Sequence, residues 1–295
     1  MIADFNKHIH QIWFQPKGSN FPVGVVGVQD YLECQKTYKE FAKRKHWRYT
    51  LWNERTVDEF IERYFNIYYE EWKNLDSIVK QIDCARCMIL YVYGGLYVDM
   101  DSYLRVDLDD FLQGEFLHRE PYPETPWHLD NKYKLKKTYR LGVGQEKVPF
   151  EYFYNKFGVI LPKINNAVIF ASPGNNIFTE IIKEGFERAD NSIVNSFGVH
   201  TFSLKVYEQM IKTIKATLRQ NNPNLPSPII TFPPIYFYET DASRDDYEKW
   251  GGDPRYKDSP LQTIVHKFDQ NWDGERYRDF LLNELDGETL DRDDG

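Results

Sequence analysis

Two acidic residues separated by one position, Asp99-Met100-Asp101, form the pattern with the clearest chemical use in this chain. Carboxylate oxygens bind hard divalent cations, and a bound cation can hold the phosphates of a ligand. In an extended segment, residues i and i+2 point to the same side, so both carboxylates would face one site. We therefore expect one carboxylate to contact a metal directly and the other to act through water or through the ribose of a nucleotide.

The spacing alone does not single out this copy, because it recurs at Asp107-Leu108-Asp109 and Asp291-Arg292-Asp293. Those copies lie in acidic stretches, and we expect them to be solvated surface. The copy at 99–101 instead follows an amphipathic segment 76–93, a Gly94-Gly95 pair and a short apolar run 96–98. This context predicts a helix, its glycine stop and a strand, and ligands bind at the carboxyl ends of strands in open α/β sheets.

The rest of the pattern predicts an α/β fold with a mixed, mostly parallel sheet flanked by helices. Predicted strands are 9–14, 47–52, 96–98, 167–171, 229–232 and 235–238, and predicted helices are 29–45, one capped at Thr56, 76–93, 175–188 and 202–219. Residues 114–162 are expected to form an irregular insertion, and 286–295 a disordered acidic tail. Residues 1–285 would then form a single domain.

Composition excludes several classes of protein. Lys and Arg total 37 against 45 Asp and Glu, a net charge of −8, which argues against non-specific nucleic-acid binding. The three cysteines do not make a disulfide framework, and the single C-x-x-C at Cys84 and Cys87 lacks the second pair of a zinc site. No signal peptide or apolar run long enough for a transmembrane helix is apparent, so we expect a cytoplasmic protein.

Several segments carry a resemblance to a known family. Residues 81–101 (QIDCARCMILYVYGGLYVDMD) resemble the DXD-containing sugar-binding region of family 32 glycosyltransferases, a group of α-1,6-mannosyltransferases, α-1,4-galactosyltransferases and bacterial capsule enzymes. They are also similar to the glucosylating domain of large clostridial toxins. Residues 8–14 (HIHQIWF), 51–54 (LWNE) and 165–169 (NNAVI) resemble further strands of the family. The resemblance is specific over residues 8–110.

The resemblance implies a GT-A-like, Rossmann-like fold, a nucleotide-sugar donor, Mn²⁺ or Mg²⁺, and retention of configuration at the anomeric carbon. Its implied residue roles are as follows: Trp13 against the base with Asn53 nearby, Asp83 and Arg86 on sugar hydroxyls and ribose, Gly95 in the donor site, Asp99 on ribose and metal, and Asp101 on the metal.

Each role has an alternative. Trp13 could be a core residue, and Asp83 with Arg86 could be an ion pair on the helix surface.

His266 is the third expected metal ligand. Residues 265–272 (VHKFDQNW) resemble the C-terminal segment of the family, although Asn271 stands where Ser is usual. A neutral imidazole can complete a metal shell beside two carboxylates, and Lys267 could neutralise a leaving phosphate. The alternative for His266 is a solvated surface residue.

The sequence as a whole predicts a metal-dependent hexosyltransferase that uses a nucleotide-sugar and a glycan acceptor, as in polysaccharide biosynthesis. Asp83, Arg86 and Asp101 are its expected catalytic residues, a UDP-sugar is favoured over GDP-mannose, and displacement would occur on the front face of the sugar. Three alternatives stay open: a glycoside hydrolase, a non-catalytic carbohydrate-binding protein, and a toxin-like enzyme that glycosylates a protein.

Overall fold

The computed structural model describes residues 5–15, 24, 26–27, 29–113, 139–145, 164–219, 229–232 and 264–266. Its strands are β1 (His8–Ile12), β2 (Arg48–Trp52), β3 (Gly95–Val98), β4 (Ser102–Leu104), β5 (Leu141–Gln145), β6 (Ile164–Ala171), β7 (Ile229–Phe232) and β8 (Ile264–His266). Its α-helices are α1 (Gln29–Lys45), α2 (Glu54–Tyr64), α3 (Tyr69–Lys73), α4 (Ile78–Tyr93), α5 (Leu108–Gln113), α7 (Ile177–Glu187) and α8 (Val199–Arg219). Two single 3₁₀ turns, η1 (Asn66–Tyr68) and η4 (Ile193–Asn195), complete the described elements.

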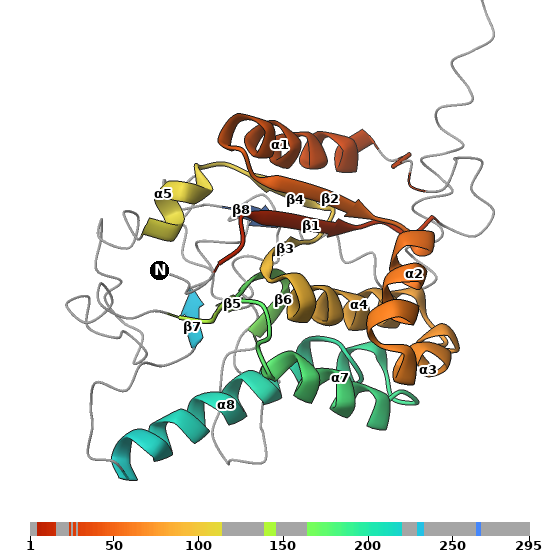
Figure 1. Ribbon diagram of the computed structural model, residues 1–295, viewed down its shortest axis with the longest axis vertical. Coiled ribbons are helices and arrows are strands. Elements are labelled where there is room, and N and C mark those ends of the chain that lie inside the picture. Colours follow the sequence, from red (N-terminus) through yellow and green to blue (C-terminus); the bar gives the residue numbers. More distant parts are fainter. Residues whose placement is uncertain are drawn as a thin grey trace, which may run out of the picture.

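The main sheet has six strands in the order β2-β1-β3-β6-β5-β7 (Figure 1). β1 pairs in parallel with both β2 and β3, and β5 pairs in parallel with β7. β6 runs antiparallel to both of its neighbours, so it alone of these six strands is reversed. A separate two-stranded ribbon joins β4 to β8. The predicted fold class, a mixed and mostly parallel sheet flanked by helices, is confirmed.

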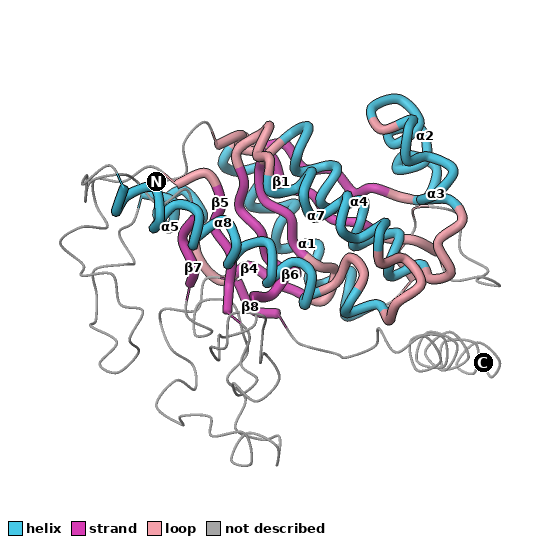
Figure 2. The backbone as a smooth tube through the Cα atoms, turned by 90° about the horizontal axis from the view of Figure 1, so that it is seen from below, coloured by secondary structure: helices cyan, strands magenta, loops and turns pink. Residues whose placement is uncertain are grey.

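Helices cover both faces of the sheet and enclose two cores. One core lies between the sheet and α2, α4, α7 and α8, and the other lies between the sheet and α1 and α5. Strand β3 shows the alternation, because Leu96 and Val98 pack in the core under α1, whereas Tyr97 packs in the core under α4. Figure 2 shows α4 and α7 running side by side across the sheet.

Helix α2 begins one turn earlier than the sequence predicted. The Asn53 side chain accepts a hydrogen bond from Thr56 N–H at 3.0 Å, and the Thr56 hydroxyl accepts one from Asn53 N–H at 2.9 Å. Asn53 is therefore the N-cap and Thr56 its reciprocal partner, a capping box in which Thr replaces the usual acid. The prediction that Thr56 caps the helix, with Glu59 three residues on, is wrong. The helix begins before Thr56, and the Thr56 amide is itself capped by Asn53.

The Gly94-Gly95 pair ends α4 and allows two close backbone contacts. Gly94 has φ of +61°, and a Cβ atom there would lie 2.6 Å from Pro173 Cδ. Gly95 has φ of +94°, and a Cβ atom there would lie 2.3 Å from the carbonyl oxygen of His8. Both the left-handed conformation and the lack of space require glycine. Gly95 is thus fixed by the packing of β3 against β1, at the amino end of β3.

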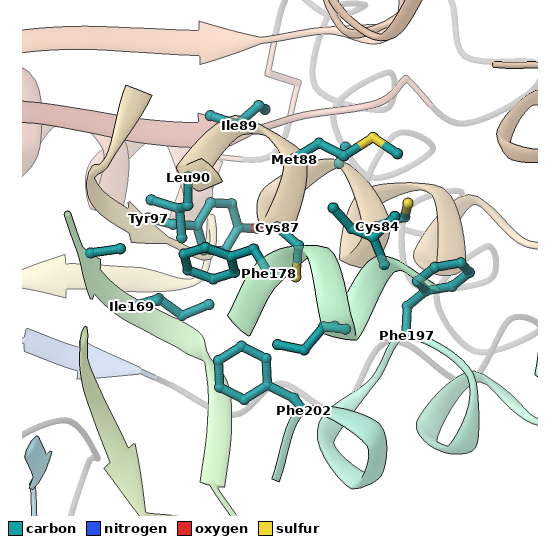
Figure 3. Close-up of a cluster of buried hydrophobic side chains, with 14 of the residues drawn as sticks. Cys84, Cys87, Met88, Ile89, Leu90, Tyr97, Ile169, Phe178, Phe197 and Phe202 are labelled. Carbon is teal, nitrogen blue, oxygen red and sulfur yellow. The ribbon is translucent and has the colours of Figure 1, made fainter. Parts of the chain in front are cut away.

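Helix α4 is buried far beyond the single apolar face that its sequence predicted. Every residue from Asp83 to Leu90 is buried, because α2 and α3 contact the helix as well as the sheet and α7. Cys84 and Cys87 point into the core that Figure 3 shows, each no more than 1% exposed. Burial raises the pKa of Cys84 well above its usual value and that of Cys87 to about 12. These thiols are packing groups in the described structure.

The predicted irregular insertion 114–162 is wrong for residues 141–145, which form β5 inside the main sheet. Leu141 and Val143 fill the core, while Gly142 and Gly144 give the segment the composition of a loop. The rest of that range, the predicted strand 235–238 and the predicted tail 286–295 lie outside the described residues.

Candidate active site

The Asp99-Met100-Asp101 segment is a tight turn between β3 and β4. Ser102 N–H donates to the carbonyl oxygen of Asp99 at 3.3 Å, and the Ser102 hydroxyl donates to the same oxygen at 2.6 Å. This i to i+3 bond closes a β-turn with Asp99 at its first position and Asp101 at its third. The prediction of an extended segment is therefore wrong. Both carboxylates still lie at the carboxyl end of β3.

Buried polar side chains fix this turn from two sides. Tyr38 of α1 donates its hydroxyl to Ser102 Oγ at 3.1 Å, and both residues are completely buried. Gln11 of β1 donates its amide to the Asp99 carbonyl at 3.3 Å, and Tyr49 of β2 donates to Gln11 at 2.8 Å. The carbonyl of Asp99 therefore receives three donors from a rigid frame, which sets the direction of the turn.

Asp83 and Arg86 form a buried ion pair that reaches the partly exposed Asp99, whose side chain is 26% exposed, and the three make up a charge network beside the turn. Arg86 Nη2 lies 2.7 Å from Asp83 Oδ1, and Arg86 Nη1 lies 3.4 Å from Asp99 Oδ1. Arg86 Nη1 also donates to the Asn166 carbonyl at 2.7 Å, and the Asn166 amide donates to Asp83 at 3.2 Å. Tyr97 places its hydroxyl 2.7 Å from Asp99 Oδ1 and its ring 4.6 Å below the guanidinium. Asp83 and Arg86 are 4% and 5% exposed, so the alternative that they form an ion pair on the helix surface is wrong.

Burial and neighbouring charges shift the pKa values of Asp83 and Arg86. Burial raises the pKa of Asp83 to about 6, against the opposing effect of the Arg86 cation. Burial also disfavours the charge of Arg86, but the Asp99 carboxylate, the Tyr97 hydroxyl and Asp83 outweigh it and raise the pKa of the guanidinium. Arg86 Nε is buried and has no hydrogen-bond partner within the described structure. The network therefore holds a permanent cation with one donor left over, next to a carboxyl that titrates near neutrality.

Trp13 lies in a small core beside the turn. The indole is 3% exposed and packs with Val26, Tyr31 and Met100. Its ring meets Tyr31 edge-on at 5.6 Å, and its Nε1–H donates to Gln15 Oε1 at 2.7 Å. Met100 therefore anchors the turn in the Trp13 cluster. The indole face does not form an open stacking surface in this structure, and its predicted contact with a base stays a prediction.

The other predicted donor-binding residues have backbone roles. Asn53 caps α2, as described above, and lies at the carboxyl end of β2. Gly95 lies at the opposite end of β3 from Asp99, packed against His8. The structure thus brings together Asp83, Arg86, Asp99 and the turn, whereas Gly95 is separated from them by the length of a strand.

His266 reaches the turn through the β4–β8 ribbon. Its backbone is paired with Ser102, the residue that follows Asp101. Its side chain, together with Lys267 and Asn271, lies outside the described part of the structure. Among the described residues no group of three His, Cys, Asp or Glu side chains could hold a metal. Two carboxylates nevertheless suit Mg²⁺ or Mn²⁺, because such ions commonly use one or two carboxylates plus the phosphates of the substrate.

Asp107 and Asp109 have the same spacing in a different setting. They lie at the start of α5 and pair with Lys45 at 2.5 Å and with Lys7 at 2.8 Å, respectively. Asp107 also accepts Asp109 N–H at 2.9 Å and so caps the helix. The expectation that this copy is solvated surface holds for its lysine partners only, because the Asp107 and Asp109 side chains are 20% and 19% exposed and Asp109 also accepts the Trp47 indole N–H at 3.2 Å. The copy at 291–293 lies outside the described residues.

Four further residues at this edge of the sheet were missed as site candidates. Asn166, Tyr97 and Ser102 contact the network or the turn, and Glu54 follows Asn53 at the end of β2. For Asn166 the sequence offered one signal, which is the pair of Asn residues at 165–166 that opens an apolar strand. For the other three no residue type or spacing marks a role, although Tyr97 and Ser102 lie within three positions of Asp99.

Comparison with known proteins agrees with this site. Residues 31–117 match the family model described as a glycosyltransferase sugar-binding region containing a DXD motif. That segment runs from α1 to just beyond α5 and contains the charge network and the turn. The predicted resemblance to glycosyltransferases is therefore confirmed.

Individual relatives share only part of their length with this chain. Inositol phosphoceramide mannosyltransferase 3 of Schizosaccharomyces pombe is 29% identical over 110 residues, which cover 37% of this chain and 28% of that protein. The uncharacterized glycosyltransferase L373 of Acanthamoeba polyphaga mimivirus is 26% identical over 204 residues, which cover 68% of this chain and 64% of that protein. Among solved structures, the bifunctional glycosyltransferase WbbM aligns with 10% identity and a TM-score of 0.46, over 96% of this chain and 50% of that chain. No described helix is long and apolar enough to cross a membrane.

Proposed function

We propose that this protein transfers a hexose from a nucleotide-sugar to a hydroxyl group of a glycan acceptor, with a divalent cation and with retention of anomeric configuration. The observation that carries the proposal is the Asp83–Arg86–Asp99 network at the turn. Buried charges are costly to desolvate, and such arrangements with perturbed pKa values concentrate at functional sites. The family match covers the same residues.

In this proposal the network holds the sugar and ribose of the donor. Arg86 offers its buried Nε–H, which has no partner in the described structure, to a hydroxyl of the ligand. Asp83 accepts a hydrogen bond from a sugar hydroxyl while Arg86 and Asn166 fix its carboxylate. Asp99, held by Tyr97 and Arg86, contacts the ribose. These contacts orient the anomeric carbon toward the turn.

Asp99, Asp101 and His266 are the proposed metal ligands. When bound, Mn²⁺ or Mg²⁺ would neutralise the charge that develops on the leaving diphosphate. The chain contributes a turn whose direction is set by Ser102 and Gln11, so the carboxylates need not reorganise when the ligand arrives.

Retention is proposed to occur by displacement on one face of the sugar. A two-step mechanism would need a carboxylate that is available to attack the anomeric carbon. Asp83 is held by two donors, and Asp99 accepts the Tyr97 hydroxyl next to the Arg86 cation. Both carboxylates are thus committed to positioning, which supports attack by the acceptor hydroxyl from the side on which the diphosphate leaves, with an oxygen of the departing diphosphate taking the hydroxyl proton.

The sugar to test first is taken from the name of a relative. A relative is named a mannosyltransferase that acts on inositol phosphoceramide, so mannose is the first hexose to test. The expected preference for UDP rests on the likeness of Trp13 to a base-stacking position, and the Trp13 side chain is buried in this structure. A protein acceptor and simple carbohydrate binding remain outcomes of the test.

The proposal is tested by thermal denaturation with UDP-, GDP-, CDP- and ADP-hexoses, each with and without Mn²⁺. A donor at about 100 times its dissociation constant should add about 2.7 kcal/mol to the free energy of unfolding. We expect at least one donor to stabilise the protein only with the metal, and its slow hydrolysis to release the sugar with retained configuration. Stabilisation by free sugars alone, or by none of the donors, would contradict the proposal.

A further inference from the structure

Glu54 lies on the same edge of the sheet as the charge network. It is the first residue of α2 and follows the carboxyl end of β2, as Asp99 follows the carboxyl end of β3. β1 lies between these two parallel strands. With strands about 4.8 Å apart, β2 and β3 are about 10 Å apart, so one elongated ligand can cross both ends.

The Glu54 carboxylate has one satisfied oxygen and one that is not. Oε1 accepts the backbone N–H of Gln15, just beyond the end of β1. Oε2 is buried and has no hydrogen-bond partner within the described structure. The adjacent cation, Arg55, points to Glu59 at 4.0 Å. An unpaired buried acceptor is destabilising. The described chain supplies no donor to this oxygen, so we expect a ligand to supply one.

We propose that Glu54 binds the base of the donor nucleotide and selects guanine. This inference rests on the proposed function, because it assumes that the diphosphate and sugar lie at Asp99 and Arg86. A nucleotide is elongated, with its base and its phosphates at opposite ends. With the phosphates at the end of β3, the base falls at the ends of β1 and β2, where Glu54 lies.

The chemistry of the base edges ranks the four common nucleotides. Guanine presents two adjacent N–H donors, N1–H and the N2 amino group, which match the two oxygens of a carboxylate. The single N3–H of uracil is flanked by two carbonyl oxygens, which a carboxylate repels. Adenine and cytosine present one amino donor beside an unprotonated ring nitrogen, so one carboxylate oxygen would face an acceptor. We therefore expect GDP to bind more tightly than UDP, ADP and CDP.

Glu54→Gln tests this order with little change in shape. Gln15 N–H needs an oxygen at the Oε1 position, so the new amide nitrogen would replace Oε2 and present a donor. Binding of GDP, UDP, CDP and ADP is measured with Mn²⁺ by calorimetry on the full chain. The matched control is Glu59→Gln, on an exposed face of the same helix.

We expect the wild type to prefer GDP, and Glu54→Gln to weaken GDP binding by about 10- to 100-fold and to narrow or reverse its advantage over UDP. Glu59→Gln should change nothing. A wild-type preference for another nucleotide would overturn the inference whether or not the variant folds. An equal loss for all four nucleotides in Glu54→Gln would also overturn it, because the carboxylate would then contact the ribose.

The readouts separate this inference from the proposed function. Selective nucleotide binding without sugar transfer to any acceptor would contradict the proposed function and leave the role of Glu54 intact. Sugar transfer together with unchanged base selectivity in Glu54→Gln would support the proposed function and contradict the role of Glu54.

Discussion

The chain carries the same acidic spacing at 99–101 and at 107–109, eight residues apart, in two different environments. Asp99 accepts a buried tyrosine hydroxyl and lies beside an arginine that is 6% exposed in its side chain. Asp107 and Asp109 pair with lysines that are 34% and 55% exposed, and Asp107 caps a short helix. Spacing is common to both, whereas the buried cation and the fixed turn belong to the first copy alone.

The two copies therefore differ in their partner cations, which are a buried arginine for Asp99 and solvent-accessible lysines for Asp107 and Asp109. Exposed ion pairs contribute little to stability and are screened by salt, so their presence at a helix end changes the free energy of unfolding very little. In a buried network, each partner that is removed leaves a charge without a counterion and without solvent. The two copies should therefore respond to mutation and to pH in opposite ways.

The largest expected effect on stability is the loss of Arg86. Arg86→Met keeps most of the side-chain volume but leaves Asp83 and Asp99 without their shared cation. The free energy of unfolding should fall by about 3–5 kcal/mol at neutral pH. Chemical denaturation measures this change. A loss no larger than that of a surface variant would show that the network is not a buried ionic unit.

The pH dependence of stability should distinguish Asp83 from Asp107. Asp83 has its pKa raised to about 6 in the fold from 3.8, so the folded state binds its proton more tightly than the unfolded state does. Its contribution is complete below about pH 4 and is lost as the pH rises to 6, a change of about 3 kcal/mol. Asp83→Asn should remove this loss, so the variant should gain stability relative to wild type as the pH rises from 4 to 7. Parallel curves for the two proteins would contradict the raised pKa.

Asp107 should show the opposite sign. Its partial burial works against ionisation, but the Lys45 ammonium and the Asp109 amide outweigh this effect and lower its pKa. Its contribution is therefore present above the ordinary carboxyl range and is lost on acidification.

The smallest expected effect is that of Lys45→Met, which removes the exposed partner of Asp107. The melting temperature should change by no more than the error of measurement, and any change should disappear in high salt. A large, salt-resistant loss would show that the second copy is also part of a buried network.

Local features were predictable from sequence, and contacts between distant segments were not. Helix α1 has its predicted bounds, because its apolar spacing is contained within 17 consecutive residues. The glycine stop after α4 was also predicted, from Gly94 and Gly95. Strand β5 was missed because its five residues become a strand only between β6 and β7, whose sequences lie far away.

The candidate site shows the same contrast between residues that are close in sequence and contacts between distant segments. Asp83, Arg86, Asp99 and Asp101 were found because they lie within 19 consecutive residues of one segment. The burial of Arg86 was not predicted, because its Asn166 partner is 80 positions away. The contact of Gln11 with the Asp99 carbonyl was not predicted for the same reason, since the two residues lie 88 positions apart.

The measurement that tests the central claim most directly is Mn²⁺-dependent donor hydrolysis by Asp101→Asn beside Asp109→Asn. Both variants remove one charge from a D-x-D copy and preserve shape. We predict that Asp101→Asn lowers the rate on the order of 100-fold with an unchanged melting temperature, whereas Asp109→Asn retains the wild-type rate. Equal rates in the two variants would contradict the assignment of the metal and donor site to Asp99-Met100-Asp101.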